Sequence, residues 1–238
     1  MAVNRIRELY AIGGPSEVLA GIGRFCYWNI LKPNTDWLFQ PDYAGVRVGT
    51  NGLLPLHTYR NYAQYKRGLL TAIDEHITPG NRVTIVGSRG VDAVKCIEAG
   101  AASVRVIEAA TEMVDITNET LRLNLDESNV KRATVEHAII GNVIDVYGDA
   151  SNARVINTSE LEPGDVLILD CEGAEQSILR GLSTWPDTVI CEAHPEHGVP
   201  ASEIVDLLET AGYETTRRTY KPDHTDPAKD IVIGSRLH

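Results

Sequence analysis

The sequence predicts an α/β fold in three layers, built on a mostly parallel sheet that ends in an antiparallel hairpin, with a mainly helical N-terminal extension. From Pro79 onward, short β-branched runs alternate with helical stretches, which is the pattern of βαβ units. The final two strands instead follow each other with no helix between them. The parallel strands are short and nearly all apolar, so helices are expected to cover both faces of the sheet.

The parallel strands are expected at short runs of apolar and β-branched residues. They are 82–86 (RVTIV), 103–107 (SVRVI), 133–138, 166–169 (VLIL) and 188–191 (TVIC). The segment 141–157 is ambiguous and leaves open one or two further short strands. The clearest helix is 201–211, which Ser202 is expected to cap and Gly212 to end.

The last two strands, 213–219 and 230–235, are joined by a polar, proline-containing linker. Without a helix between them they should pair antiparallel. A parallel sheet closed by such a hairpin favours the class I methyltransferase architecture over a dehydrogenase-type sheet, which continues with parallel crossovers.

The first third of the chain differs from the rest in composition. Segments 15–30 and 57–76 have helical spacing, and an irregular stretch, 32–55, lies between them. Residues 1–76 carry 8 basic and 6 acidic side chains, whereas residues 77–238 carry 14 basic and 27 acidic ones. Ten of the 14 Phe, Tyr and Trp residues precede Lys66. We therefore predict an extension over 1–76 and a ligand-binding domain over 77–238.

Composition excludes several classes of protein. With 238 residues, 43% hydrophobic and 23% charged, the chain resembles ordinary globular proteins. A net charge of -11 disfavours a general nucleic-acid binder. The four cysteines, Cys26, Cys96, Cys171 and Cys191, lack CxxC spacing, which favours neither a zinc site nor a disulfide framework. No signal peptide or membrane-spanning helix is expected, and the cytoplasm is the expected location.

A glycine turn follows the first parallel strand, where the sequence is VGSRGVDAV. Gly87 and Gly90 there would let a ligand approach the backbone closely, because glycine has no side chain and accepts positive φ. The alternative is a tight βα connection that binds nothing.

Glu108 follows Gly87 by 21 residues, at the end of the next strand. Doubly wound folds place there the acid that accepts hydrogen bonds from ribose hydroxyls, although a lone Glu at a strand end is more often solvated. The dinucleotide fingerprint G-x-G-x-x-G is incomplete, since Ser88 and Arg89 separate the glycines and Ala93 replaces the third one. S-adenosylmethionine (SAM) carries no phosphate, so these departures favour SAM over NAD.

Three carboxylates follow the strand VLIL, in the sequence Asp170-Cys171-Glu172-Gly173-Ala174-Glu175. Like charges gathered in a cleft need a compensating cation or hydrogen bonds, and the sulfonium and α-amino groups of SAM would supply both. The alternative, strongest for Glu175, is that the glutamates favour the positive end of the following helix.

The segment DCEGAEQSILRGL resembles the D-x-E-G-x-E…L-x-G-L signature of FkbM-type SAM-dependent methyltransferases. VGSRGVDAV, VIEAATEMVDITNETLRLN and VICEAHPEHG are also similar to this family, over roughly residues 80–235. The chain departs from it at Thr84 and Ile85, where members often carry an acid, and at Arg89, which replaces a small residue.

The resemblance implies a Rossmann-like class I enzyme that methylates hydroxyl groups of sugars, polyketides or other metabolites, with residues 77–238 as its SAM-binding domain. Glu108 would hold the ribose, Asp170 would lie near the methionine moiety, and Ala138, after the third strand, near the adenine. The cofactor residues expected are Gly87, Ser88, Gly90, Glu108, Ala138, Asp170 and Glu172.

Methyl transfer to a hydroxyl requires a base, and His194 is the candidate because an imidazole titrates near neutrality. Glu192 is expected to orient it, so that the catalytic set is His194, Asp170 and Glu192. Two alternatives stay open: these three residues bind a divalent cation, or His194 has no catalytic role. The expected site contains no metal.

The partner expected is a small-molecule acceptor. Base-methylating enzymes use a [DN]-P-P-[YFW] motif or a Pro-Cys pair, and the chain has neither, which disfavours nucleic acid. Aromatic residues of the extension are expected to cover the acceptor or to hold the extension on the domain; they are Tyr27, Trp28, Trp37, Phe39, Tyr59 and Tyr62. Alternative functions are an NAD-dependent oxidoreductase or a non-catalytic adenosine-nucleotide-binding protein, and homo-oligomerisation is left open.

Overall fold

A computed structural model describes residues 42–50, 66–141, 149–221 and 228–236. Residues 42–49 and 62–238 form one compact unit, and the fold below is that of its described residues. The expected helix at 15–30, the irregular stretch up to residue 41 and the six named aromatic residues of the extension lie outside the described residues. The division at residue 76 stays a prediction.

The centre of the unit is an eight-stranded sheet in the order β6-β5-β4-β3-β7-β8-β10-β9. The strands are β3 (Arg82–Val86), β4 (Ser103–Glu108), β5 (Ala133–Ile140), β6 (Arg154–Ile156), β7 (Val166–Leu169), β8 (Thr188–Ala193), β9 (Glu214–Tyr220) and β10 (Lys229–Ser235). Strands β3 to β8 pair in parallel, whereas β10 lies antiparallel between β8 and β9. The mostly parallel sheet and its terminal hairpin are therefore confirmed.

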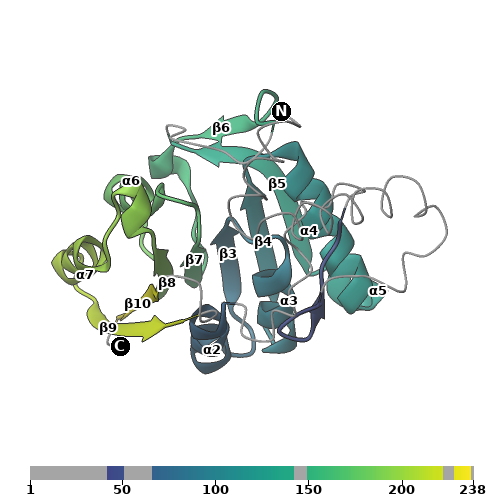
Figure 1. The fold of residues 1–238 in the computed structure, drawn as a ribbon, viewed down its shortest axis with the longest axis horizontal. Coiled ribbons are helices and arrows are strands. Elements are labelled where there is room, and N and C mark those ends of the chain that lie inside the picture. The colour runs from purple at the N-terminus through teal and green to yellow at the C-terminus, as the bar shows by residue number, and fades with distance from the viewer. Residues whose placement is uncertain (1–41, 51–65, 142–148, 222–227, 237–238) are drawn as a thin grey trace, which may run out of the picture. The chain divides into compact units, whose positions relative to one another are not determined.

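Helices cover both faces of the sheet, which gives the three predicted layers (Figure 1). The four residues of β7 are all buried and alternate between two hydrophobic clusters. Val166 and Ile168 face the cluster that includes α2 (Arg67–His76), α3 (Val91–Glu98) and α4 (Thr111–Asn124), whereas Leu167 and Leu169 face α6 (Glu175–Gly181) and α7 (Ala201–Thr210). Burial on both faces explains the uninterrupted apolar sequence of this strand.

Shorter elements complete the described unit. They are the ribbon of β1 (Asp42–Tyr43) and β2 (Val46–Arg47), the helix α5 (Glu127–Val130), and the 3-10 turns η4 (Thr158–Glu160) and η5 (Pro195–His197). The ambiguous segment 141–157 contributes the single described strand β6, and residues 142–148 lie outside the described residues. Helix α2 corresponds to the end of the helix expected at 57–76 and packs on β8, β9 and β10. No helix among the described residues is long and apolar enough to cross a membrane.

Two local predictions were wrong. Ser202 does not cap α7, because the helix already begins at Ala201 after an extended Pro200 and Ser202 lies inside the first turn. The third parallel strand continues to Ile140, so Ala138 lies within β5 and not after it. The predicted end of α7 is confirmed, since Gly212 adopts a φ of +88°.

Candidate functional site

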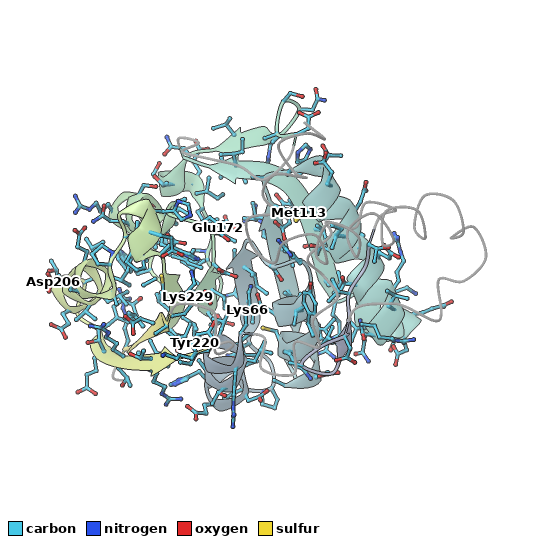
Figure 2. All side chains as sticks on the ribbon, in the orientation of Figure 1. Lys66, Met113, Glu172, Asp206, Tyr220 and Lys229 are labelled. Atoms are coloured by element: carbon cyan, nitrogen blue, oxygen red, sulfur yellow. The ribbon has the colours of Figure 1, made fainter. Side chains whose placement is uncertain are left out.

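The residues expected to carry function gather at the carboxyl ends of β3, β4, β7 and β8, which are neighbours in the sheet. The glycine turn follows β3, Glu108 ends β4, Asp170 follows β7, and His194 follows β8. In open α/β sheets this edge is where ligands bind. Figure 2 shows Lys66, Glu172 and Lys229 near the middle of the view, whereas Asp206 lies on the outer helix α7.

The glycine turn makes close contacts inside the protein. Gly87 has a φ of +75°, and a Cβ there would lie 2.2 Å from the carbonyl oxygen of Asp170. Gly90 has a φ of +87°, and a Cβ there would lie 2.8 Å from Cβ of Thr120. Packing inside the protein is therefore sufficient to require glycine at both positions. Their approach to a ligand stays a prediction.

Glu108 fastens this turn to β4. Its Oε1 accepts hydrogen bonds from the backbone N–H groups of Ser88 (2.9 Å) and Arg89 (3.0 Å) and from the Thr117 hydroxyl (3.2 Å). The residue is 5% exposed, and burial raises the pKa of its carboxyl while these donors oppose the rise. No described residue donates a hydrogen bond to Oε2. Oε1 of Glu108 thus holds the turn, and Oε2 is available to accept a hydrogen bond from a ligand at the edge of the sheet.

Lys66 is the counter-ion of the acids at this edge. Its ammonium forms an ion pair with Oδ2 of Asp170 and a second one, at 3.1 Å, with Oδ2 of Asp92. Asp92 is fully buried in the first turn of α3, and its Oδ1 has no hydrogen-bond partner among the described residues. Burial raises the pKa of Asp92 to about 6 despite the ammonium, whereas Lys66 and His194 hold the pKa of Asp170 below its usual value against the effect of burial. The sequence analysis assigned the compensating charge to SAM, whereas in the structure Lys66 of the protein itself pairs with two of the acids.

His194 is buried among carboxylates. Its Nδ1 lies 2.8 Å from Oε1 of Glu175, and this oxygen also accepts a hydrogen bond from the backbone N–H of Cys171. The other carboxylate oxygen, Oε2, accepts one from the backbone N–H of Gly173. Burial lowers the pKa of His194, but Glu175 and the neighbouring acids outweigh it and raise the pKa to about 9. At neutral pH the ligand-free chain therefore holds an imidazolium, and a base at this position must first lose its proton.

Glu192, in β8, is held by residues of the terminal hairpin. Its Oε2 accepts a hydrogen bond from the Tyr220 hydroxyl (3.0 Å), and Nζ of Lys229 lies 4.0 Å from its Oε1. Burial and the charge of Asp170 raise the pKa of Glu192 to about 7. Glu192, Asp170 and His194 each offer one metal-ligating atom within 4.8 Å of the others.

The structure brings together most of the predicted site residues. Gly87, Ser88, Gly90 and Glu108 form one group, and Asp170, Glu192 and His194 form a second one. Glu172 lies at the rim, with its side chain 42% exposed and Oε2 3.9 Å from Nε2 of His194. Ala138 is buried in β5, within the cluster that α6 and α7 cover.

Lys66, Tyr220 and Lys229 were not predicted from the sequence. For Glu175 a place at the helix terminus was favoured over a role in the ligand site. None of these residues belongs to a local motif, and each meets its partner through the tertiary fold. The one signal available was electrostatic, because buried acids at one edge require a cation.

A separate hollow of about 580 Å³ lies over the amino ends of β3 and β4 and beside β6. Among its lining residues, Glu136 pairs with Arg105 (2.7 Å) and Arg154 (3.0 Å). Glu160, Glu162 and Arg82 also line the hollow, so its three arginines face three glutamates and no charge surplus is left to attract an ionic ligand.

The sheet order and the antiparallel β10 define a Rossmann-like fold of the class I methyltransferases. No protein-family profile and no curated protein matches the chain. Among solved structures, the magnesium protoporphyrin IX methyltransferase of Synechocystis PCC 6803 with bound SAM is similar over 74% of this chain and 81% of that chain, with a TM-score of 0.53 and 15% identity. The same enzyme with bound S-adenosylhomocysteine (SAH) covers 74% and 84%, with a TM-score of 0.52 and 14% identity.

A putative RNA methyltransferase from Pyrococcus horikoshii is also similar, at 19% identity and a TM-score of 0.48, over 76% of this chain and 86% of that chain. At these identities the likeness defines the fold and leaves the acceptor open.

Proposed function

We propose that the chain is a SAM-dependent methyltransferase that methylates a hydroxyl group of a small organic acceptor. The observation that carries the proposal is the divided role of Glu108, whose Oε1 holds the glycine turn while Oε2 accepts no hydrogen bond from a described residue. A ribose offers two hydroxyl donors, which an ionised carboxylate oxygen accepts well. The likeness to an enzyme solved with SAM and with SAH supports the same ligand.

The glycine turn also favours SAM over a dinucleotide. A dinucleotide site uses backbone N–H groups of this turn to bind the pyrophosphate. Here the N–H groups of Ser88 and Arg89 donate to Glu108, so they are already engaged. The acids Asp92 and Asp170 beside the turn would further repel a phosphate and attract a cationic ligand.

We assign the acceptor side of the site to Asp170, Glu192 and His194. Transfer of a methyl group from a sulfonium requires an aligned nucleophile and the exclusion of water, and the low exposure of Glu192 (5%) and His194 (1%) suits the second requirement. His194 is the proposed base. The positive charge that SAM brings to the site would favour the neutral imidazole that this role needs.

The finer assignments belong to the same proposal. The motif DCEGAEQSILRGL supports membership of the FkbM-type family, whose members act on hydroxyl groups. The net charge of -11 supports a metabolite acceptor over a nucleic acid. The cytoplasm remains the proposed location.

Methyl-labelled SAM offered with three acceptor pools tests the proposal. The pools are a metabolite extract, total RNA and a protein extract, each incubated with the wild-type chain, with His194→Ala and with Glu136→Gln as the control. We expect label in the small-molecule fraction, stable to mild base as an ether is, with Glu136→Gln active and His194→Ala at least about 100-fold slower. Label in RNA alone would contradict the acceptor class, and equal turnover by His194→Ala would remove the base.

A further inference from the structure

Asp170, Glu192 and His194 share one arrangement, in which an outer atom of each side chain is held by a neighbour. Oδ2 of Asp170 pairs with Lys66, Oε2 of Glu192 accepts from Tyr220 at 3.0 Å, and Nδ1 of His194 lies 2.8 Å from Glu175. These contacts come from segments far apart in the sequence. They fix the orientation of all three side chains before any ligand binds.

The inner atoms of the same three side chains face one another. Nε2 of His194 lies 3.5 Å from Oδ1 of Asp170 and 3.9 Å from Oε1 of Glu192. These distances exceed those of a hydrogen bond, and no described residue forms a hydrogen bond with Nε2, although His194 is only 1% exposed. The ring nitrogen Nε2 thus faces two carboxylate oxygens at distances longer than those of a hydrogen bond.

The spacing of the inner atoms is close to that around a metal ion. All three lie within 4.8 Å of one another. Nitrogen and oxygen ligands bind such ions at about 2.0–2.2 Å, so two ligands of one ion are roughly 3–4.2 Å apart. Shifts of roughly 1 Å or less would bring the three atoms into ligand positions.

We propose that Asp170, Glu192 and His194 bind one divalent cation. Two carboxylates and an imidazole balance its charge and suit Mn²⁺ or Zn²⁺ better than Mg²⁺, which prefers oxygen ligands. The contact between His194 and Glu175 corresponds to the carboxylate–histidine–metal arrangement, in which an outer carboxylate orients the ligating ring.

The surrounding charges leave room for a cation. Lys66, Lys229 and the imidazolium of His194 are the cations of this cluster among the described residues. Six acids oppose them, because Asp92, Glu172, Glu175 and Glu196 add to the two ligating acids. The site therefore retains a surplus of negative charge.

Three protein ligands also leave coordination positions open, as catalytic metal sites do. An acceptor oxygen bound there would lie beside the methyl donor. With the cation bound His194 acts as a ligand, so the role of base assigned to it above applies to the chain without the cation. This last role rests on the proposed function, whereas binding of the cation does not.

Electron paramagnetic resonance of Mn²⁺ tests the site on the untagged chain, because the signal of the free ion disappears on binding. The variants Asp170→Asn and Glu192→Gln each remove the charge of one ligand and keep the side-chain shape, and His194→Gln removes the ligating imidazole. His197→Ala is the matched control, since its ring contacts only Glu172 (3.4 Å) among the acids. Tyr220→Phe removes an outer partner without touching a ligand, and thermal melting confirms that each variant is folded.

We expect one bound Mn²⁺ per chain, displaced by Zn²⁺. Affinity should fall at least about tenfold in each ligand variant and about tenfold or more in Tyr220→Phe, with His197→Ala unchanged. Failure of the wild-type chain to bind 1 mM Mn²⁺ or Zn²⁺, at roughly the weak limit of protein cation sites, would overturn the proposal. The proposal would also be overturned if the single variants Tyr220→Phe and Glu192→Gln both bound Mn²⁺ as tightly as the wild-type chain. Calorimetry with SAM on the same samples distinguishes the two proposals. If the wild-type chain binds SAM but does not bind Mn²⁺, the metal site is refuted and the proposed function is not.

Discussion

Glu108 is the residue whose replacement tests most of the cofactor account, because its two oxygens have separate duties. In Glu108→Gln the side-chain carbonyl can still accept from the N–H groups of Ser88 and Arg89, so the turn should survive. The amide that replaces Oε2 carries no charge and cannot accept from a ribose hydroxyl. A hydrogen bond to a charged group contributes about 1.5–3 kcal/mol, so the dissociation constant of SAM should rise roughly 10- to 150-fold.

Glu108→Ala removes both duties. Two backbone donors, one buried and one partly buried, then lose their acceptor, at about 1–3 kcal/mol each. We therefore expect the free energy of unfolding to fall by about 2–5 kcal/mol in Glu108→Ala and by less than about 1 kcal/mol in Glu108→Gln.

Urea denaturation measures stability and calorimetry with SAM measures affinity, with Glu136→Gln on the adjacent strand as the control for both. Wild-type affinity in Glu108→Gln would place the ribose elsewhere. Equal destabilisation by the two variants of Glu108 would refute the description of the turn.

Three further predictions concern the packing and charges around the site, each measured by urea denaturation. Gly87→Ala should lower the free energy of unfolding by more than about 2 kcal/mol, because its Cβ would meet the Asp170 carbonyl. Gly80 is the control: it has a φ of +98° but lies in open space, so Gly80→Ala should lower the free energy of unfolding by only about 1–2 kcal/mol. Equal losses in the two variants would mean that the clash is absent. Lys66→Met should lower the free energy of unfolding by about 3–5 kcal/mol, because Asp170 and Asp92 then lack their counter-ion. Lys95→Met, in the more exposed pair with Glu98, is the control and should lose less than about 1 kcal/mol. A loss below about 1 kcal/mol in Lys66→Met would contradict the buried ion pair. Asp92 faces Lys66, Asp170 and Ser88, and its pKa is raised to about 6. The folded chain therefore binds the proton of the Asp92 carboxyl more tightly than the unfolded chain does. Protonated Asp92 thus stabilises the fold at low pH, and this contribution disappears as the pH rises from about 4 to 6. The stability of Asp92→Asn relative to the wild type should therefore increase by about 3 kcal/mol over that interval and stay constant above it; a constant difference from pH 4 to 7 would show that the pKa is not raised.

The parts of the fold that sequence predicts well are those that depend on local pattern. The uninterrupted apolar run of β7 follows from burial on both faces, and the hairpin of β9 and β10 follows from the polar linker between two strand-like segments. The end of β5 was harder to predict, because Ile139 and Ile140 continue the strand into a segment that lacks any clear period.

The candidate site divides in the same way. Glu108 was predicted from its distance along the chain to Gly87, since a βαβ unit has a nearly constant length. Lys66 lies 104 positions before Asp170, and Tyr220 lies 28 positions after Glu192, so only the folded sheet brings these pairs together. The pKa of His194 could not be predicted either, because it depends on Glu175, Asp170 and Glu172 converging on one buried ring.

Binding of SAM at the edge of the sheet beside Gly87 and Glu108 is tested by isothermal titration calorimetry of the purified chain with SAM, SAH and NAD. SAM and SAH should bind with micromolar dissociation constants, both weakened in Glu108→Gln, and NAD should not bind. Micromolar binding of NAD, with no heat from SAM or SAH, would contradict it.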